Sequence, residues 1–118
     1  MYKSFKEMPV WKDAMAIAVE IFSATKGLPK YEEYGFTSQI RRAALSMSAN
    51  IAEAYGRKHK KDKVNFYHIA LGSSTETQSH IEYGRRVKYF TQENADALNK
   101  KLEIFFNDIN KVIRSLEP

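Results

Sequence analysis

Apolar residues recur at helical spacing in four segments of the chain, and short stretches with turn residues separate them. The first segment predicts a helix over residues 9–26. It begins at Pro9, a residue suited to the first helical position because the N–H that it lacks would be unpaired there. Gly27 is expected to cap this helix and Pro29 to stop it. Two adjacent apolar rows predict a wide buried stripe: Val10, Ala14, Ile17 and Ile21, and beside them Trp11, Met15, Ala18 and Phe22.

The second segment predicts a helix over residues 37–55, with Thr37 as its N-cap and Gly56 as its C-cap. Small residues dominate its expected inner face, so a neighbouring helix can approach closely. That face consists of Ile40, Ala43, Ala44, Met47, Ile51 and Ala54.

The third segment predicts a helix over residues 62–88, which is about 40 Å long at 1.5 Å per residue. Asp62 complements the positive end of the helix dipole, and basic residues near Arg86 complement the negative end. The expected inner face is unusually small and polar: Phe66, Ile69, Ala70, Ser73, Thr77, Ile81, Gly84 and Val87.

The fourth segment predicts a helix over residues 92–116, with Thr91 as its N-cap. Its apolar positions alternate spacings of four and three, the heptad pattern of a helix packed lengthwise on others. These positions are Leu98, Leu102, Phe105, Ile109, Val112 and Leu116.

Short connections between long helices require antiparallel neighbours, so the pattern predicts an all-α, antiparallel, up-down-up-down four-helix bundle. A length of 118 residues fits a single domain over 1–118. The chain has no cysteine, which excludes disulfides and thiolate zinc sites and fits a reducing cytoplasm. We see no apolar run long enough for a membrane span and no leader segment, so we expect a cytoplasmic protein.

Mapping the charge is more informative than its total, which is +5. Between Gly56 and Phe90 there are eight lysines and arginines against three acidic residues, while the remaining residues balance at eleven against eleven. A localised basic surface indicates an anionic partner such as nucleic acid. The alternative is a lysine-rich but merely solvated helix and loop.

The motifs of catalysis are missing from the sequence. None of the three histidines follows a glutamate by three residues, the spacing that bundles use for metals. We find no phosphate-binding glycine loop and no serine nucleophile motif. We therefore expect no catalytic residues, no metal, no cofactor and no enzymatic activity.

A row of polar residues follows one stripe of the second helix at spacings of three and four. Such a row could form a hydrogen-bonded network at a helix or subunit seam, or it could be an exposed, salt-bridged face. We expect Arg42 to join this network with Glu53 or with Glu76 of the third helix, and Arg41 to reach solvent or a neighbouring subunit. The predicted network consists of Gln39, Arg42, Ser46, Asn50, Glu53 and Glu76, and Arg57 continues the row.

Three stretches together resemble a known family: PVWKDA from Pro9, FTSQIRRAALSMSANIAEAYGR from Phe36, and FYHIALGSSTE from Phe66. The sequence is similar to the small bacterial four-helix-bundle proteins encoded in intervening sequences of 23S rRNA genes. A relative of that family is the accessory variability determinant of diversity-generating retroelements. The resemblance implies a left-handed bundle that assembles as a homo-oligomer, typically a pentamer, with a basic surface proposed to bind nucleic acid and no known catalytic activity.

The first functional hypothesis is therefore a non-enzymatic, oligomeric module that binds the phosphate backbone of RNA or DNA. The alternative is a protein-interaction scaffold or accessory subunit that docks an acidic partner or a nucleic-acid enzyme. A small-ligand or metal-binding bundle is a third hypothesis, which the missing ligand motifs make unfavourable. The candidate nucleic-acid-binding residues are Arg41, Arg57, Lys58, Lys60, Lys61, Lys63, Arg85, Arg86 and Lys88.

Overall fold

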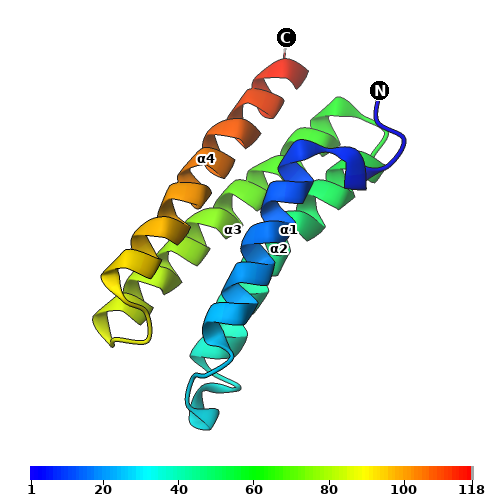
Figure 1. Cartoon of the computed structure of the whole chain (residues 1–118). Coiled ribbons are helices and arrows are strands. Elements are labelled where there is room, and N and C mark those ends of the chain that lie inside the picture. The colour runs from blue at the N-terminus through cyan, green and yellow to red at the C-terminus, as the bar shows by residue number, and fades with distance from the viewer. Residues whose placement is uncertain (118) are drawn as a thin grey trace.

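The computed structural model describes residues 1–117 and consists of four long helices and two short 3-10 turns. The helices are α1 (Pro9–Thr25), α2 (Phe36–Gly56), α3 (Lys60–Arg86) and α4 (Gln92–Leu116), and the turns are η1 (Phe5–Glu7) and η2 (Lys30–Glu32). The helices run alternately up and down in a body of 45 × 23 × 20 Å (Figure 1). This confirms the predicted all-α antiparallel bundle.

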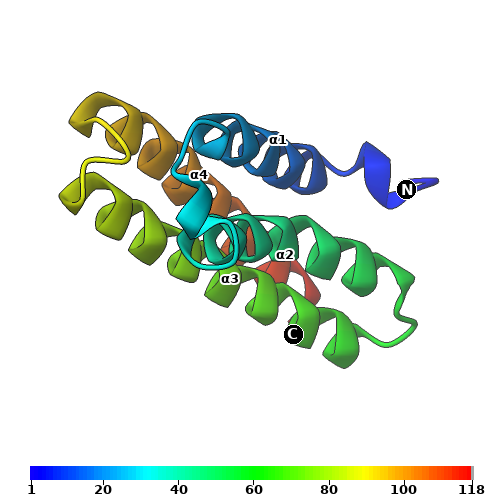
Figure 2. The same cartoon turned by 90° about the horizontal axis from the view of Figure 1, so that it is seen from below.

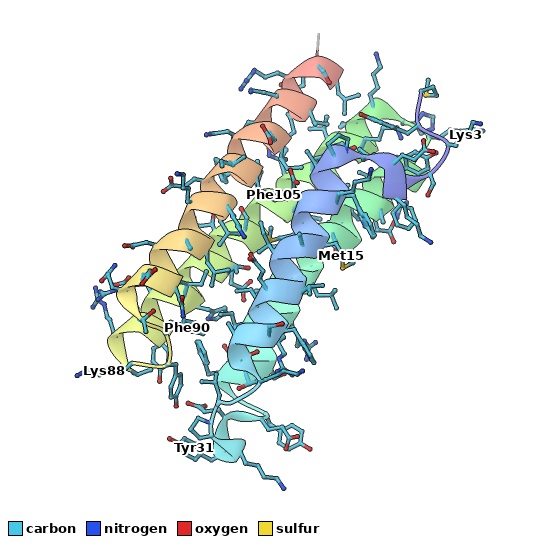
Figure 3. The ribbon with its side chains drawn as sticks, viewed as in Figure 1. Lys3, Met15, Tyr31, Lys88, Phe90 and Phe105 are labelled. Atoms are coloured by element: carbon cyan, nitrogen blue, oxygen red, sulfur yellow. The ribbon has the colours of Figure 1, made fainter. Side chains whose placement is uncertain are left out.

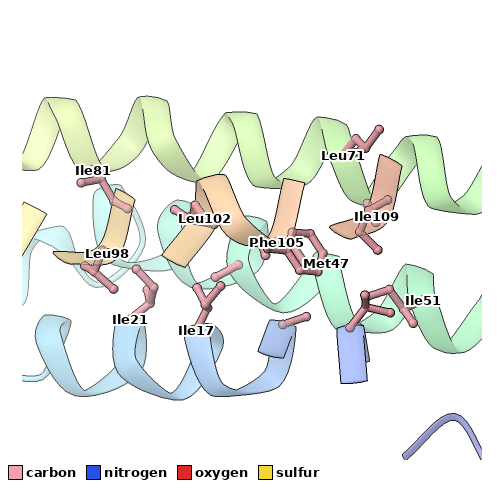
Figure 4. Packing of buried hydrophobic residues seen from close by; sticks show 14 of the residues in the cluster. Ile17, Ile21, Met47, Ile51, Leu71, Ile81, Leu98, Leu102, Phe105 and Ile109 are labelled. Carbon is pink, nitrogen blue, oxygen red and sulfur yellow. The ribbon is translucent and has the colours of Figure 1, made fainter. Parts of the chain in front are cut away.

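Each helix packs against the helices before and after it, and α4 closes the bundle against α1. Figure 2 shows the four helices from below. Bulky side chains from all four helices fill the interior, where Ile21, Met47, Ile81 and Phe105 are almost completely buried (Figure 4). Helices α2 and α3 also contribute small buried groups, among them Ala44 and Ala70.

Local caps fix where the helices begin and end. Pro9 is the first residue of α1, and the Thr91 hydroxyl accepts a hydrogen bond of 3.1 Å from the Asn94 N–H, so both of these predictions are confirmed. Thr37 as N-cap is wrong, because α2 already begins at Phe36 and Thr37 is buried inside it. The Glu32 carboxylate accepts from the Phe36 N–H instead, at 3.3 Å.

The helices end close to the predicted glycines, but the C-cap residues are Lys26 and Arg57 and not Gly27 and Gly56. The first helix ends at Thr25, before Gly27, and α2 continues through Gly56. The third helix begins at Lys60 and ends at Arg86, so both ends lie two residues before the predicted bounds of 62 and 88. A turn follows in which Lys88 takes a positive φ of 69°. In that turn the Tyr89 N–H donates to the Gly84 carbonyl over 2.7 Å, which satisfies an orphan carbonyl of the helix end.

The buried faces agree with the predicted rows in α2, but they differ in the other helices. In α4 the buried row passes from Ile109 to Ile113 and leaves Val112 half-buried, because a straight helix drifts away from a strict heptad. In α3 the side chains of Ile69 and Val87 are exposed by 49% and 41%, which corrects their predicted place in the core. Tyr67, Leu71 and Ser74 are buried instead, since α3 packs against α4 as well as α2.

The second apolar row of α1 is only partly covered by the bundle. Trp11, Met15 and Ala18 are only half-buried, and Phe22 is 47% exposed. The buried stripe of α1 is thus the first predicted row, Val10, Ala14, Ile17 and Ile21. One chain alone buries a narrower stripe than its sequence predicts.

An aromatic cluster lies at the end of the bundle opposite the N-terminus. It joins the α1–α2 connection to the α3–α4 turn. The ring of Phe36 packs against Tyr89 and Phe90, with ring centroids 5.4 and 6.0 Å apart. The Tyr89 hydroxyl donates to the Glu32 carboxylate over 2.5 Å. Gly84 leaves the space for this cluster, because a Cβ there would lie 2.6 Å from the Phe90 ring.

We therefore expect Gly84→Ala to lower the free energy of unfolding by about 1–3 kcal/mol, since the added methyl overpacks the aromatic cluster. Urea denaturation followed by circular dichroism measures this change. Gly72→Ala is the matched control: nothing lies within 4 Å of its added Cβ, so replacing this mid-helix glycine raises stability by about 0.5–1 kcal/mol. Equal effects of the two substitutions would contradict the packing argument.

Candidate nucleic-acid interface

The antiparallel topology gathers basic side chains at one end of the bundle. The N-terminus, the α2–α3 turn and the C-terminus of α4 lie together there, as Figure 1 shows. Segments 1–8, 53–64 and 114–117 carry eight basic against four acidic side chains. Segments 26–41 and 82–96, at the opposite end, carry six against five. The charge excess therefore belongs to a single end of the molecule.

The centre of this basic end is the turn cluster: Arg57, Lys58, Lys60, Lys61 and Lys63. Only three residues separate α2 from α3, so two helix ends fix the position of this short turn. The carboxylates near the turn are Glu53 and Asp62. The first turn of α3 adds the positive end of its helix dipole.

Two members of the turn cluster already hold partners within the chain. The Lys63 ammonium donates to the carbonyls of Ala54 and Tyr55 at 3.0 and 3.2 Å, which caps the end of α2. The Arg57 guanidinium pairs with Glu53 at 3.2 Å and lies 4.7 Å from the centroid of the Phe66 ring. Arg57 stays exposed, whereas Lys63 is half-buried.

The remaining three members are different. Lys58, Lys60 and Lys61 are exposed, and among residues 1–117 none of them has a side-chain hydrogen bond or an ion pair. Each ammonium keeps three donors for an external ligand. These lysines are the strongest candidate contacts for an anionic partner.

The predicted cluster at the far end of α3 is largely neutralised. Glu82 accepts hydrogen bonds from Arg85 at 2.7 and 3.1 Å and from Arg86 at 2.8 Å. These bonds, with Arg85 the larger contributor, lower the pKa of the Glu82 carboxyl to about 2. Lys88 remains exposed at the tip of this turn, far from Lys3 at the basic end (Figure 3).

Arg41 does not reach solvent in the way that we expected. Its Nε donates to the Thr25 hydroxyl over 2.8 Å, and its guanidinium lies 4.4 Å from the centroid of the Phe22 ring. It thereby fastens the start of α2 to the end of α1 and corrects the prediction of a free side chain. The structure places it apart from the turn cluster.

The predicted polar network forms in part. Ser46 accepts from Asn50 and from Ser73 of α3, both at 2.9 Å, so a short hydrogen-bonded chain joins α2 to α3. The Glu53–Arg57 and Glu76–His80 pairs, at 3.2 and 3.3 Å, are separate contacts at the surface.

The expected ion pairs of Arg42 with Glu53 or Glu76 are not present. Arg42 and Gln39 are exposed and have no side-chain partner among the described residues. Both side chains line a groove of about 340 Å³ between α2 and α3, and Glu76 lies on its opposite wall.

Sequence reasoning missed part of the basic end. Lys3, Lys6 and Arg114 lie far from the turn cluster in the sequence, but the fold brings them to the same end. The predicted alternation of up and down helices was the signal that could have located them. Within residues 1–117, no three metal-ligating side chains gather into a site, and no helix is both long and apolar enough to cross a membrane.

We expect Arg41→Ala to lower the free energy of unfolding by about 1–2 kcal/mol, because it removes a hydrogen bond and a cation–π contact between α1 and α2. Chemical denaturation measures the loss. Lys30→Ala, which removes an exposed lysine near the same helix ends, is the control and stays within about 0.5 kcal/mol of wild type. An unchanged stability of Arg41→Ala would show that these contacts do not hold the helices.

The low pKa of Glu82 predicts a specific dependence of stability on pH. Because the folded-state pKa of about 2 lies below the ordinary 4.5, the Glu82 pairs stabilise the fold above pH 4.5, and this contribution is lost as the pH falls toward 2. The free energy of unfolding is measured by urea denaturation between pH 2 and 7. In Glu82→Gln it falls less steeply than in the wild type between pH 4.5 and 2. Glu103→Gln on α4 serves as the control and keeps the wild-type profile.

Comparisons with known proteins agree with this architecture. A family model described as "23S rRNA-intervening sequence protein" matches residues 6–111. Among solved structures, the chain is similar to a protein of unknown function from the S23 ribosomal protein family of Bacteroides thetaiotaomicron VPI-5482. The TM-score is 0.79 at 26% sequence identity, and the match covers 88% of this chain and 97% of that one. No curated protein matches the chain significantly.

Proposed function

Since the chain belongs to the 23S rRNA-intervening sequence protein family, we propose that it is a non-enzymatic, homo-oligomeric module that binds nucleic acid. In this proposal the turn cluster contacts the phosphate backbone of RNA or DNA. One observation carries it: Lys58, Lys60 and Lys61 are exposed and unpaired within residues 1–117, at the end of the bundle that holds the charge excess.

Unpaired lysines are energetically suited to phosphate binding. A lysine that already holds a carboxylate must give up that partner when a phosphate arrives, whereas Lys58, Lys60 and Lys61 lose only bound water and counterions. The release of counterions from the nucleic acid then favours binding. Arg86 and Arg85 would first have to leave Glu82, so the turn cluster is the favoured site.

Neighbouring groups at the basic end support the same site. Arg57 is held in place by Glu53 and the Phe66 ring, yet it remains exposed beside the lysines. Lys3 and Lys6 extend the positive surface from the N-terminal segment. Phosphate contacts position a protein on nucleic acid, while contacts with base edges supply specificity. We therefore expect affinity to depend strongly on salt and weakly on base sequence.

The test replaces Lys58, Lys60 and Lys61 together with alanine and measures the anisotropy of a fluorescent 20-nucleotide RNA and of a DNA duplex across a salt series. Losing three phosphate contacts reduces the slope of log K against log salt by about 2 for the single strand and nearly 3 for the duplex.

The matched control replaces Lys26, Lys30 and Lys100, which are also exposed and change the net charge equally. It keeps nearly the full slope if the turn cluster is the site. If both triple variants bound the nucleic acid equally weakly, net charge alone would explain the loss of affinity, and the proposal would be contradicted. Wild-type affinity that does not change with salt would contradict it as well.

A further inference from the structure

A pocket lies between the end of α1 and the start of α2, at the end of the bundle opposite the turn cluster (Figure 1). We name it the α1–α2 pocket. Its volume of about 310 Å³ is close to the lower limit for small-molecule sites. Polar and charged residues form most of its lining, so it suits a polar ligand: Thr25, Lys26, Lys30, Glu33, Thr37 and Arg41.

The Thr37 side chain gives the first indication of a ligand. The residue is only 8% exposed, and its hydroxyl has no hydrogen-bond partner among residues 1–117. The helix does not use this hydroxyl as the N-cap that the sequence predicts. A buried hydroxyl without a partner costs free energy, because it has given up its hydrogen bonds with water. Since Thr37 lines the pocket, a ligand there can supply the missing partner.

Arg41 offers donors to the same pocket from a fixed position. Its Nε donates to the Thr25 hydroxyl over 2.8 Å, and its Nη2 donates to the Phe22 carbonyl over 3.4 Å. The guanidinium also lies 4.4 Å from the centroid of the Phe22 ring. These bonds use only part of the guanidinium, so most of its N–H donors remain for a ligand. A side chain that is already held in place loses little conformational entropy when it binds an anion.

Two lysines add positive charge that the described part of the chain does not use. Lys26 and Lys30 are exposed, and within residues 1–117 neither has an ion pair or a side-chain hydrogen bond. The carbonyls at the end of α1 do not require them as caps, because backbone N–H groups already donate to those of Ser23 and Thr25. Both ammonium groups are therefore free to bind a ligand in the pocket that they line.

The carboxylates around the pocket leave it positively charged. Glu33 is the one acidic residue among those described in its lining. The neighbouring Glu32 is occupied, since it accepts from the Phe36 N–H and from the Tyr89 hydroxyl. Three cations against one carboxylate give the lining a charge of +2, although the charges at this end of the bundle almost balance. The excess matches an anion that carries two negative charges.

We propose that the α1–α2 pocket binds a terminal phosphate group, as in a phosphomonoester. Such a group carries about −1.5 to −2 charges at neutral pH and accepts several hydrogen bonds at once. In this assignment Arg41, Lys26 and Lys30 hold the phosphate oxygens, and the Thr37 hydroxyl donates to one of them. A backbone phosphodiester carries a single charge and matches the pocket less well. The pocket is therefore a second site, independent of the turn cluster.

Nuclear magnetic resonance tests the site with inorganic phosphate and with adenosine 5′-monophosphate at constant ionic strength. We expect both probes to cause saturable shifts of the Thr37 N–H and the Arg41 Nε–H, and adenosine to cause none. Dimethyl phosphate, which has the single charge of a backbone phosphodiester, is expected to bind about tenfold more weakly. Phosphate shifts that centre on the turn cluster and leave Thr37 unchanged would overturn the proposal.

Variants separate the pocket from net charge. Thr37→Val removes the hydroxyl and is expected to bind phosphate about threefold to tenfold more weakly, while stability without phosphate stays equal or rises. Replacing Lys26 and Lys30 together with alanine weakens binding by about tenfold or more. The matched control replaces Lys12 and Lys100, which are exposed and lie outside the pocket, and it keeps the wild-type affinity. Wild-type phosphate affinity in Thr37→Val, or equal losses in the two double variants, refutes the site.

A 12-nucleotide RNA with and without a 5′-phosphate distinguishes two sources of the phosphate. If the 5′-phosphate strengthens binding in the wild type and not in Thr37→Val, the pocket holds the end of a nucleic acid. If only the small probes shift Thr37, it holds a free phosphate compound. The variant without Lys58, Lys60 and Lys61 is expected to keep the phosphate shifts, so failure of the turn cluster and failure of the pocket are told apart.

Discussion

The close packing of α2 against α3 is the constraint on which the rest of the structure depends. Small side chains meet at this seam, and the Ser46 and Ser73 hydroxyls are within hydrogen-bond distance at 2.9 Å. Larger residues here would push the helices apart and break this contact. Because the connection between the two helices spans only residues 57–59, the seam also determines where the turn cluster lies.

The same seam explains how the core is shared among the helices. Helices α2 and α3 contribute alanine, serine and threonine at many buried positions, and all four helices supply large buried side chains, among them Ile21, Met47, Ile81 and Phe105. At the end of the bundle opposite the N-terminus, a small residue again faces a large one, since Gly84 of α3 leaves space for the Phe90 ring. The bundle is therefore packed by large residues that face small ones, which makes it sensitive to added volume at the small positions.

Much of the fold could be predicted from the sequence because its signals are local. The start of α1 at Pro9 and the Thr91 cap depend on residues within one turn, and both predictions are confirmed. The errors arise where a distant or loop residue supplies the contact. Glu32 displaces Thr37 as the cap of α2, and Thr25 and Phe22 hold Arg41 from a different helix. No spacing rule along one helix encodes such partners.

The position of the candidate site could be predicted from the sequence. Which of its basic side chains are free to bind a partner could not. Counting charges assigns equal weight to Lys63, Lys60 and Arg85, yet the first caps α2, the second is unpaired within the described residues, and the third holds Glu82. Whether a basic side chain is free depends on which carboxylate or carbonyl the fold brings within reach of it. Conversely, Lys3 and Lys6 join the basic end only because α1 and α2 are antiparallel.

Exposed apolar side chains and unpaired cations make opposite physical demands, and they lie in different parts of the bundle that residues 1–117 form. Phosphate binding requires exposed cations that have no internal partner, which the turn provides at one end. Burial against another protein requires a face without such cations, because an ammonium removed from water must be paired. Phe22 and Leu45 are exposed on the outer side of α1 and α2, whereas Lys58, Lys60 and Lys61 lie in and beside the turn at the end of the bundle.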